Sequence, residues 1–85
     1  MQKFDYTIQA PEGIHARPAG LLARCAQGCA SEVRISLGNK TANAKRLFAI
    51  LELGIKQGDI IALKVEGENE TSEYEMLQAC CRKNL

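Results

Sequence analysis

The single histidine of this 85-residue chain is the side chain best suited to chemistry. His15 lies in the segment Gly-Ile-His-Ala-Arg-Pro-Ala at 13–19, where a loop passes into a predicted helix. Most surface histidines carry no special chemistry, but one at a helix N-terminus lies beside backbone amides without intrahelical partners, a good setting for phosphate. A ring nitrogen so placed can act as a nucleophile and hold a phosphoryl group. The amides of Ala16 and Arg17, and the Arg17 guanidinium, would then balance its charge.

Hydrophobic periodicity predicts the elements that must position this segment. Strands are predicted over residues 4–8, 33–37, 40–43 and 60–66, with a hairpin turn at Gly38-Asn39. Helices are predicted over residues 14–30 and 46–53, the second closed by Gly54, and a last one capped by Asn69 or Thr71. The order β-α-β-β-α-β-α, with one apolar face per element, predicts a single α+β domain over residues 1–85. Three helices would cover one face of a four-stranded antiparallel sheet in two layers.

The composition of the chain argues against several classes of function. With 46% hydrophobic and 25% charged residues the chain is an ordinary globular one. A net charge of +1 and only 5% aromatic residues argue against nucleic-acid binding. No apolar run is long enough for membrane insertion, and residues 1–13 lack the apolar stretch of a secretory signal, so we expect a cytoplasmic protein. Eight of the eleven Lys and Arg residues fall in residues 1–58 against four Asp and Glu, so this part should face acidic partners.

The four cysteines form no recognised framework. Cys25 and Cys29 lie four apart on a predicted helix, Cys80 and Cys81 are adjacent, and no C-x-x-C pair occurs. This spacing favours small apolar residues in a reducing compartment over a disulfide scaffold. The alternatives are a zinc site from all four thiols and a surface thiol that is sensitive to oxidation.

The motif around His15 is also the core of a resemblance that extends over the chain. Together with Gly-Asn-Lys-Thr-Ala-Asn-Ala-Lys at 38–45, and Leu-Gly-Ile at 53–55 followed by Gln-Gly at 57–58, it resembles the histidine-containing phosphocarrier (HPr) family of the bacterial phosphoenolpyruvate-dependent sugar phosphotransferase system. The resemblance implies an open-faced β-sandwich. It also implies that His15 takes a phosphoryl group on Nδ1 from phosphorylated Enzyme I and passes it to histidines of sugar-specific IIA domains. Arg17 would neutralise the phosphate.

The same resemblance implies a carrier with a phosphohistidine intermediate rather than a turnover enzyme, with no metal and no organic cofactor. A small transient carrier of this kind is most simply a monomer. Partners would dock on the second predicted helix beside the histidine. The expected docking residues are Arg24, Lys45, Arg46, Leu47, Phe48 and Leu51.

Two positions depart from the family pattern. Arg46 stands where many members carry a regulatory serine at the start of the second helix, so control by the serine kinase is not expected, and we hypothesise that Arg46 meets an acidic partner. Glu12 replaces a small neutral polar residue, and a carboxylate there would repel the phosphoryl dianion if it pointed inward. A repulsion of under about 1 kcal/mol would tune phosphoryl transfer rather than abolish it. Ala49 and Glu52 are expected to alter partner selectivity.

Two other functions remain open at this stage. A regulatory binding module of the same fold would dock on an enzyme or a transcription factor without passing phosphate onward. A phosphocarrier of a nitrogen-regulatory branch would keep the chemistry and change the partners. The presence of both His15 and Arg17 favours a carrier over a docking module.

Overall fold

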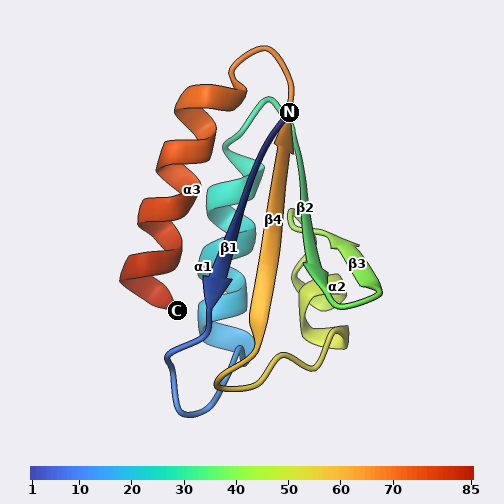
Figure 1. The fold of residues 1–85 in the computed structure, drawn as a ribbon, viewed down its shortest axis with the longest axis vertical. Coiled ribbons are helices and arrows are strands. Elements are labelled where there is room, and N and C mark those ends of the chain that lie inside the picture. The colour runs from blue at the N-terminus through green and yellow to red at the C-terminus, as the bar shows by residue number, and fades with distance from the viewer.

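The chain folds in the predicted order of four strands and three helices (Figure 1). The computed structural model describes all 85 residues. The elements are β1 (Gln2–Thr7), α1 (Ala16–Gln27), β2 (Glu32–Leu37), β3 (Lys40–Asn43), α2 (Leu47–Glu52), β4 (Ile60–Glu66) and α3 (Glu70–Asn84). The predicted two-layer α+β sandwich is therefore confirmed.

The four strands form one antiparallel sheet in the order β1-β4-β2-β3. Its register aligns Phe4 with Leu63 and Leu63 with Ile35, and all three side chains are buried. Because side chains alternate between the faces of a strand, the neighbouring row lies on the opposite, open face. That row contains the exposed Lys3, Lys64 and Arg34. The apolar row faces the helices, and the polar row explains why the other face carries no second layer.

Helix α1 is held to the sheet by one apolar face. Ala19, Leu22, Ala23 and Ala26 are buried on it, at the three- and four-residue spacing of a helix. Burial of a leucine side chain such as Leu22 contributes roughly 1.5–3 kcal/mol. Helices α1 and α3 pack against each other on the same face of the sheet (Figure 1). Helix α3, the longest at 15 residues, is too short and too polar to cross a bilayer, and so are the other two.

The predicted bounds of the first helix are wrong in detail, whereas the last helix begins after Asn69, one of its two predicted caps. Helix α1 covers residues 16–27 rather than 14–30, because the His15 backbone is extended and the Cys29 amide bonds only three residues back, to the Ala26 carbonyl. Asn69 occupies the N-cap position of α3, but its side chain makes no capping hydrogen bond. Gly54 ends α2 as predicted, with a φ of 66° that side chains disfavour.

Candidate functional site

The loop before α1 is fixed by a close backbone approach at Gly13. Its φ is +69°, and a Cβ there would strike the Ile55 carbonyl oxygen and lie 2.7 Å from the Lys56 Cα. The next amide, that of Ile14, donates to the Ile55 carbonyl at 3.1 Å. Only glycine fits this conformation and this contact. The loop is thus pressed against residues 55–56, and His15 follows at the surface.

His15 is the N-cap residue of α1. Its backbone is extended (φ −102°, ψ −170°), and its carbonyl accepts the Ala19 amide at 3.0 Å. The imidazole makes no capping bond, and the side chain is 48% exposed. The amides of Ala16 and Arg17 donate to no protein acceptor, and Pro18 has no N–H to donate. An anion beside the ring therefore meets two open donors and the positive end of the helix dipole.

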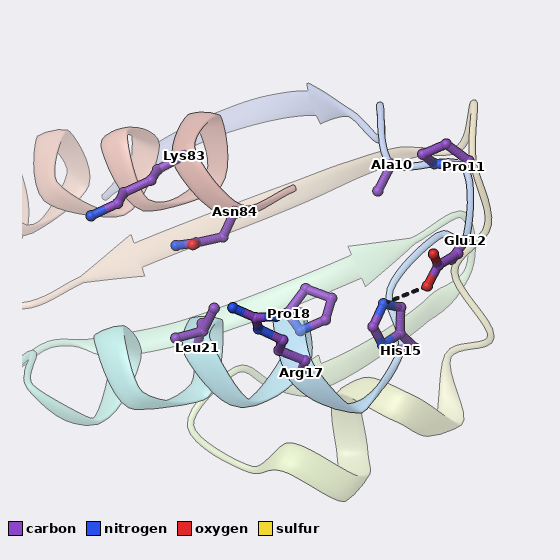
Figure 2. A pocket seen from close by; sticks show the side chains of 9 residues that line it. All are labelled: Ala10, Pro11, Glu12, His15, Arg17, Pro18, Leu21, Lys83 and Asn84. Atoms are coloured by element: carbon purple, nitrogen blue, oxygen red, sulfur yellow. Dashed lines mark ion pairs between the residues drawn. The ribbon is translucent and has the colours of Figure 1, made fainter.

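The Glu12 side chain reaches the His15 ring from the loop. Glu12 Oε2 lies 2.9 Å from Nε2 of the imidazole (Figure 2). This contact is an ion pair when the imidazole is protonated, and a neutral ring with its proton on Nε2 would present its lone pair on Nδ1. Sequence analysis foresaw only a repulsion between Glu12 and a phosphoryl group. In the structure the carboxylate instead lies against Nε2, so Nδ1 is the ring nitrogen without a carboxylate in ion-pair contact.

His15 lies at one end of a surface hollow of about 390 Å³. Its nine lining residues are Ala10, Pro11, Glu12, His15, Arg17, Pro18, Leu21, Lys83 and Asn84. The Arg17 side chain extends along α1, away from the imidazole, and makes no ion pair (Figure 2). Its predicted role in phosphate neutralisation stays a prediction. The far end of the hollow comes from α3, where Lys83 adds a cation that sequence analysis missed, since nothing in the local pattern shows which helix ends meet.

The structure gathers four of the six predicted docking residues. A second hollow of about 550 Å³ is lined by Lys45, Arg46, Leu47 and Phe48, together with Gln27, Ala49 and Glu52. Phe48 is 74% exposed, whereas Leu47 and Leu51 are half-buried against the core. Lys45 donates through Nζ to the Cys29 carbonyl at 2.9 Å, so part of its charge is used within the chain. Arg24 is exposed on α1, and neither it nor Leu51 lines this hollow.

The thiols do not provide a metal centre. No group of three or more His, Cys, Asp and Glu side chains is arranged to hold a metal ion, so the zinc-site alternative lacks a ligand set. Burial raises the pKa of Cys80 to about 11 and that of Cys81 to about 12. Both groups are therefore protonated thiols near neutral pH.

An open-faced antiparallel sandwich that presents an exposed histidine at a helix N-terminus defines a class of small histidine phosphocarriers. A family model described as the PTS HPr component phosphorylation site matches residues 2–83. The chain belongs to this HPr family, the phosphocarriers of the phosphotransferase system, as its sequence predicted.

Similar proteins agree with this assignment. The chain is 36% identical over 85 residues to the phosphocarrier protein HPr of Mycoplasma genitalium, covering 99% of this chain and 97% of that one. It is 44% identical over 70 residues to HPr of Buchnera aphidicola, covering 82% of each. It is 35% identical over 78 residues to a multiphosphoryl transfer protein of Xanthomonas campestris, covering 92% of this chain but only 9% of that protein.

Solved structures agree on the fold. An HPr structure from Thermoanaerobacter tengcongensis superposes with a TM-score of 0.92 at 31% identity, covering 99% of this chain and 94% of that one. A structure described as an HPr dimer from the same organism superposes with a TM-score of 0.76, also at 31% identity, covering 98% and 95%. The expected monomeric state of this chain stays a prediction.

Proposed function

We propose that this chain accepts a phosphoryl group from phosphorylated Enzyme I on Nδ1 of His15 and passes it to a histidine of a sugar-specific IIA domain. The observation that carries the proposal is the exposed imidazole at the start of α1, beside the two unpartnered amides of Ala16 and Arg17. Membership of the HPr family supports the same chemistry.

In the proposed reaction the Nδ1 lone pair attacks phosphorus. The bond between phosphorus and the Enzyme I donor atom breaks, and its electron pair stays with the donor. The ring keeps its proton on Nε2, where the Glu12 carboxylate 2.9 Å away stabilises the positive charge that the ring gains. Transfer onward reverses these steps, with the IIA histidine as nucleophile and the His15 imidazole as leaving group.

The site balances binding of the phosphoryl group against its release. The Ala16 and Arg17 amides would donate hydrogen bonds to the dianion, and the helix dipole stabilises an exposed anion by roughly 0.3–1 kcal/mol. The Arg17 guanidinium would turn back toward the ring, a rotamer change that exposed side chains make in nanoseconds or less. Since the imidazole is 48% exposed, all these interactions are weakened by water. A phosphoryl group held this way is stable enough to form and loose enough to leave.

Partner docking is proposed at the second hollow beside α2. Phe48 offers an exposed aromatic ring of the kind that anchors interfaces. Arg46, at the N-cap position of α2, is exposed and makes no ion pair, so it is free to meet an acidic partner surface. Rim charges of this kind speed encounter more than they strengthen binding, which suits a carrier that must leave each partner quickly.

Incubation with phosphoenolpyruvate and Enzyme I tests the phosphoryl-acceptor role. We expect an acid-labile, base-stable phosphate on the chain that is absent from His15→Ala, a substitution at an exposed side chain. Glu75→Ala is the control, because Glu75 is exposed on α3 and lines neither hollow. Label that persists in His15→Ala, or no label on the native chain, would refute the proposal.

A second incubation, with a IIA domain added, tests the transfer onward. We expect label to move to the IIA domain and to leave His15. Label that forms on the chain but reaches no IIA domain would refute the sugar-uptake step and favour a docking or nitrogen-branch role.

A further inference from the structure

Two cysteines far apart in the sequence meet between α1 and α3. Cys25 and Cys80 are separated by 55 residues, yet their Sγ atoms lie 2.7 Å apart, with the Cys80 thiol donating to the Cys25 sulfur. A disulfide bond is about 2.05 Å long, so the sulfurs need to approach by only about 0.7 Å. Both cysteines are free thiols in this structure.

The other two cysteines have no such partner. Cys29 directs its thiol to the backbone carbonyl of Cys25, and Cys81 is fully buried. Cys25 is half-buried and is the more open of the two to a small oxidant, whereas Cys80 is buried, with 8% of its surface exposed. One accessible thiol beside one sheltered thiol is the arrangement of an attacking and a resolving cysteine.

We propose that Cys25 and Cys80 are a modification site, a thiol pair that a peroxide converts reversibly into a disulfide joining α1 to α3. The Cys25 thiol loses its proton, the thiolate attacks one peroxide oxygen, and the O–O bond breaks to give a sulfenic acid and hydroxide. The hydroxide takes up the proton that the thiol lost and leaves as water. The Cys80 sulfur then attacks the Cys25 sulfur, its proton goes to the departing hydroxyl, and a second water leaves. Two thiols are oxidised by two electrons and one peroxide is reduced to two waters.

The Cys25–Cys80 disulfide would restrain a residue that lines the His15 hollow. Asn84, which lines that hollow, donates its side-chain amide to the Cys80 carbonyl at 3.1 Å and to the Cys80 sulfur at 3.5 Å. Oxidation would engage this sulfur in a covalent bond and fix the C-terminal half of α3 against α1. The pair is defined by its own geometry, so the site does not depend on the proposed transfer from Enzyme I.

Treatment of the whole chain with hydrogen peroxide, followed by intact mass and peptide mapping, tests the proposal. We expect the mass to fall by two hydrogen atoms and the number of free thiols to fall from four to two. Peptide mapping should show a crosslink between the peptides of Cys25 and Cys80. Because the bond closes a long loop, we expect the thermal midpoint to rise by at least about 5 °C. A dithiol reductant should restore the original mass and midpoint.

Three variants keep the result interpretable. Cys25→Ser and Cys80→Ser should each lose the crosslink, and agreement between them guards against one variant failing to fold. Cys29→Ser, the matched control, should still form it. The proposal is overturned by a Cys25–Cys29 crosslink, by a covalent dimer in place of the internal bond, or by a native chain that keeps all four thiols under peroxide.

Discussion

Replacing Glu12 by glutamine separates two roles of its carboxylate. The side chain stays nearly the same size and can still contact Nε2 of His15, but it loses its charge. The 2.9 Å contact and the width of the ring together place the carboxylate about 7 Å from a phosphoryl group on Nδ1. It lies about 4 Å from the centre of the ring itself.

At these distances the repulsion between Glu12 and the phosphoryl dianion nearly cancels the attraction between Glu12 and the positively charged ring. In water a unit negative charge repels a dianion at about 7 Å by about 1.2 kcal/mol and attracts a positive ring at about 4 Å by about 1 kcal/mol. The equilibrium for phosphorylation of His15 should therefore change by less than about threefold in Glu12→Gln. Without the carboxylate in contact with Nε2 the ring is held less firmly, and a loss of about 1 kcal/mol should lower the rate of phosphoryl acceptance about fivefold.

Rapid-quench measurements with labelled phosphoenolpyruvate and Enzyme I give both the rate and the equilibrium. Glu68→Gln is the control, since this exposed glutamate lies in the loop between β4 and α3, at the opposite end of the molecule (Figure 1). An equilibrium shift of tenfold or more would refute the cancellation and restore Glu12 as a repelling charge. An unchanged rate would refute its orienting role.

Three further predictions concern stability and docking. Gly13→Ala should destabilise the fold by at least about 2 kcal/mol in denaturant unfolding, since its φ is +69° and the Lys56 backbone lies against it. Phe48→Ala should weaken binding of Enzyme I at least about fivefold in titration calorimetry without lowering the thermal midpoint, because the ring is 74% exposed. Burial raises the pKa of Cys81 from 9.0 to about 12, so its contribution to stability is full below pH 9 and falls by at most about 4 kcal/mol as the pH rises to 12. In denaturant unfolding of the reduced protein, the free energy of unfolding should therefore decrease less steeply between pH 9 and pH 12 in Cys81→Ala than in the native chain.

The glycine and phenylalanine substitutions each have a counterpart that should behave differently. Gly20→Ala should leave stability unchanged or raise it slightly, since a Cβ there meets no atom within 4 Å. Met76→Ala, at an apolar side chain 42% exposed on α3, should leave partner binding unchanged. Equal losses of stability in the two glycine variants, or equal losses of Enzyme I binding in the Phe48 and Met76 variants, would contradict the corresponding prediction. So would an equal decrease of stability with pH in the native chain and in Cys81→Ala.

Much of the fold was predictable because it is encoded locally. Apolar residues spaced by two, as in Val33 and Ile35, or by three and four, as in Leu22 and Ala26, select strands and helices from the geometry of the backbone alone. The His15 site was predictable for the same reason. Its ring and the open amides of Ala16 and Arg17 are consecutive in the chain, so a helix N-terminus is enough to bring them together.

The tertiary structure alone decided which distant groups meet. Nothing in the sequence near Gly13 shows that the backbone of Ile55 and Lys56 will press against it, or that α3 will bring Lys83 to the His15 hollow. The Cys25–Cys80 contact is the clearest case, since the spacing of the four cysteines favoured four unrelated apolar side chains. Periodicity fixes the face that a helix buries, but the order of the strands and the packing of two helices on one sheet fix what that face touches.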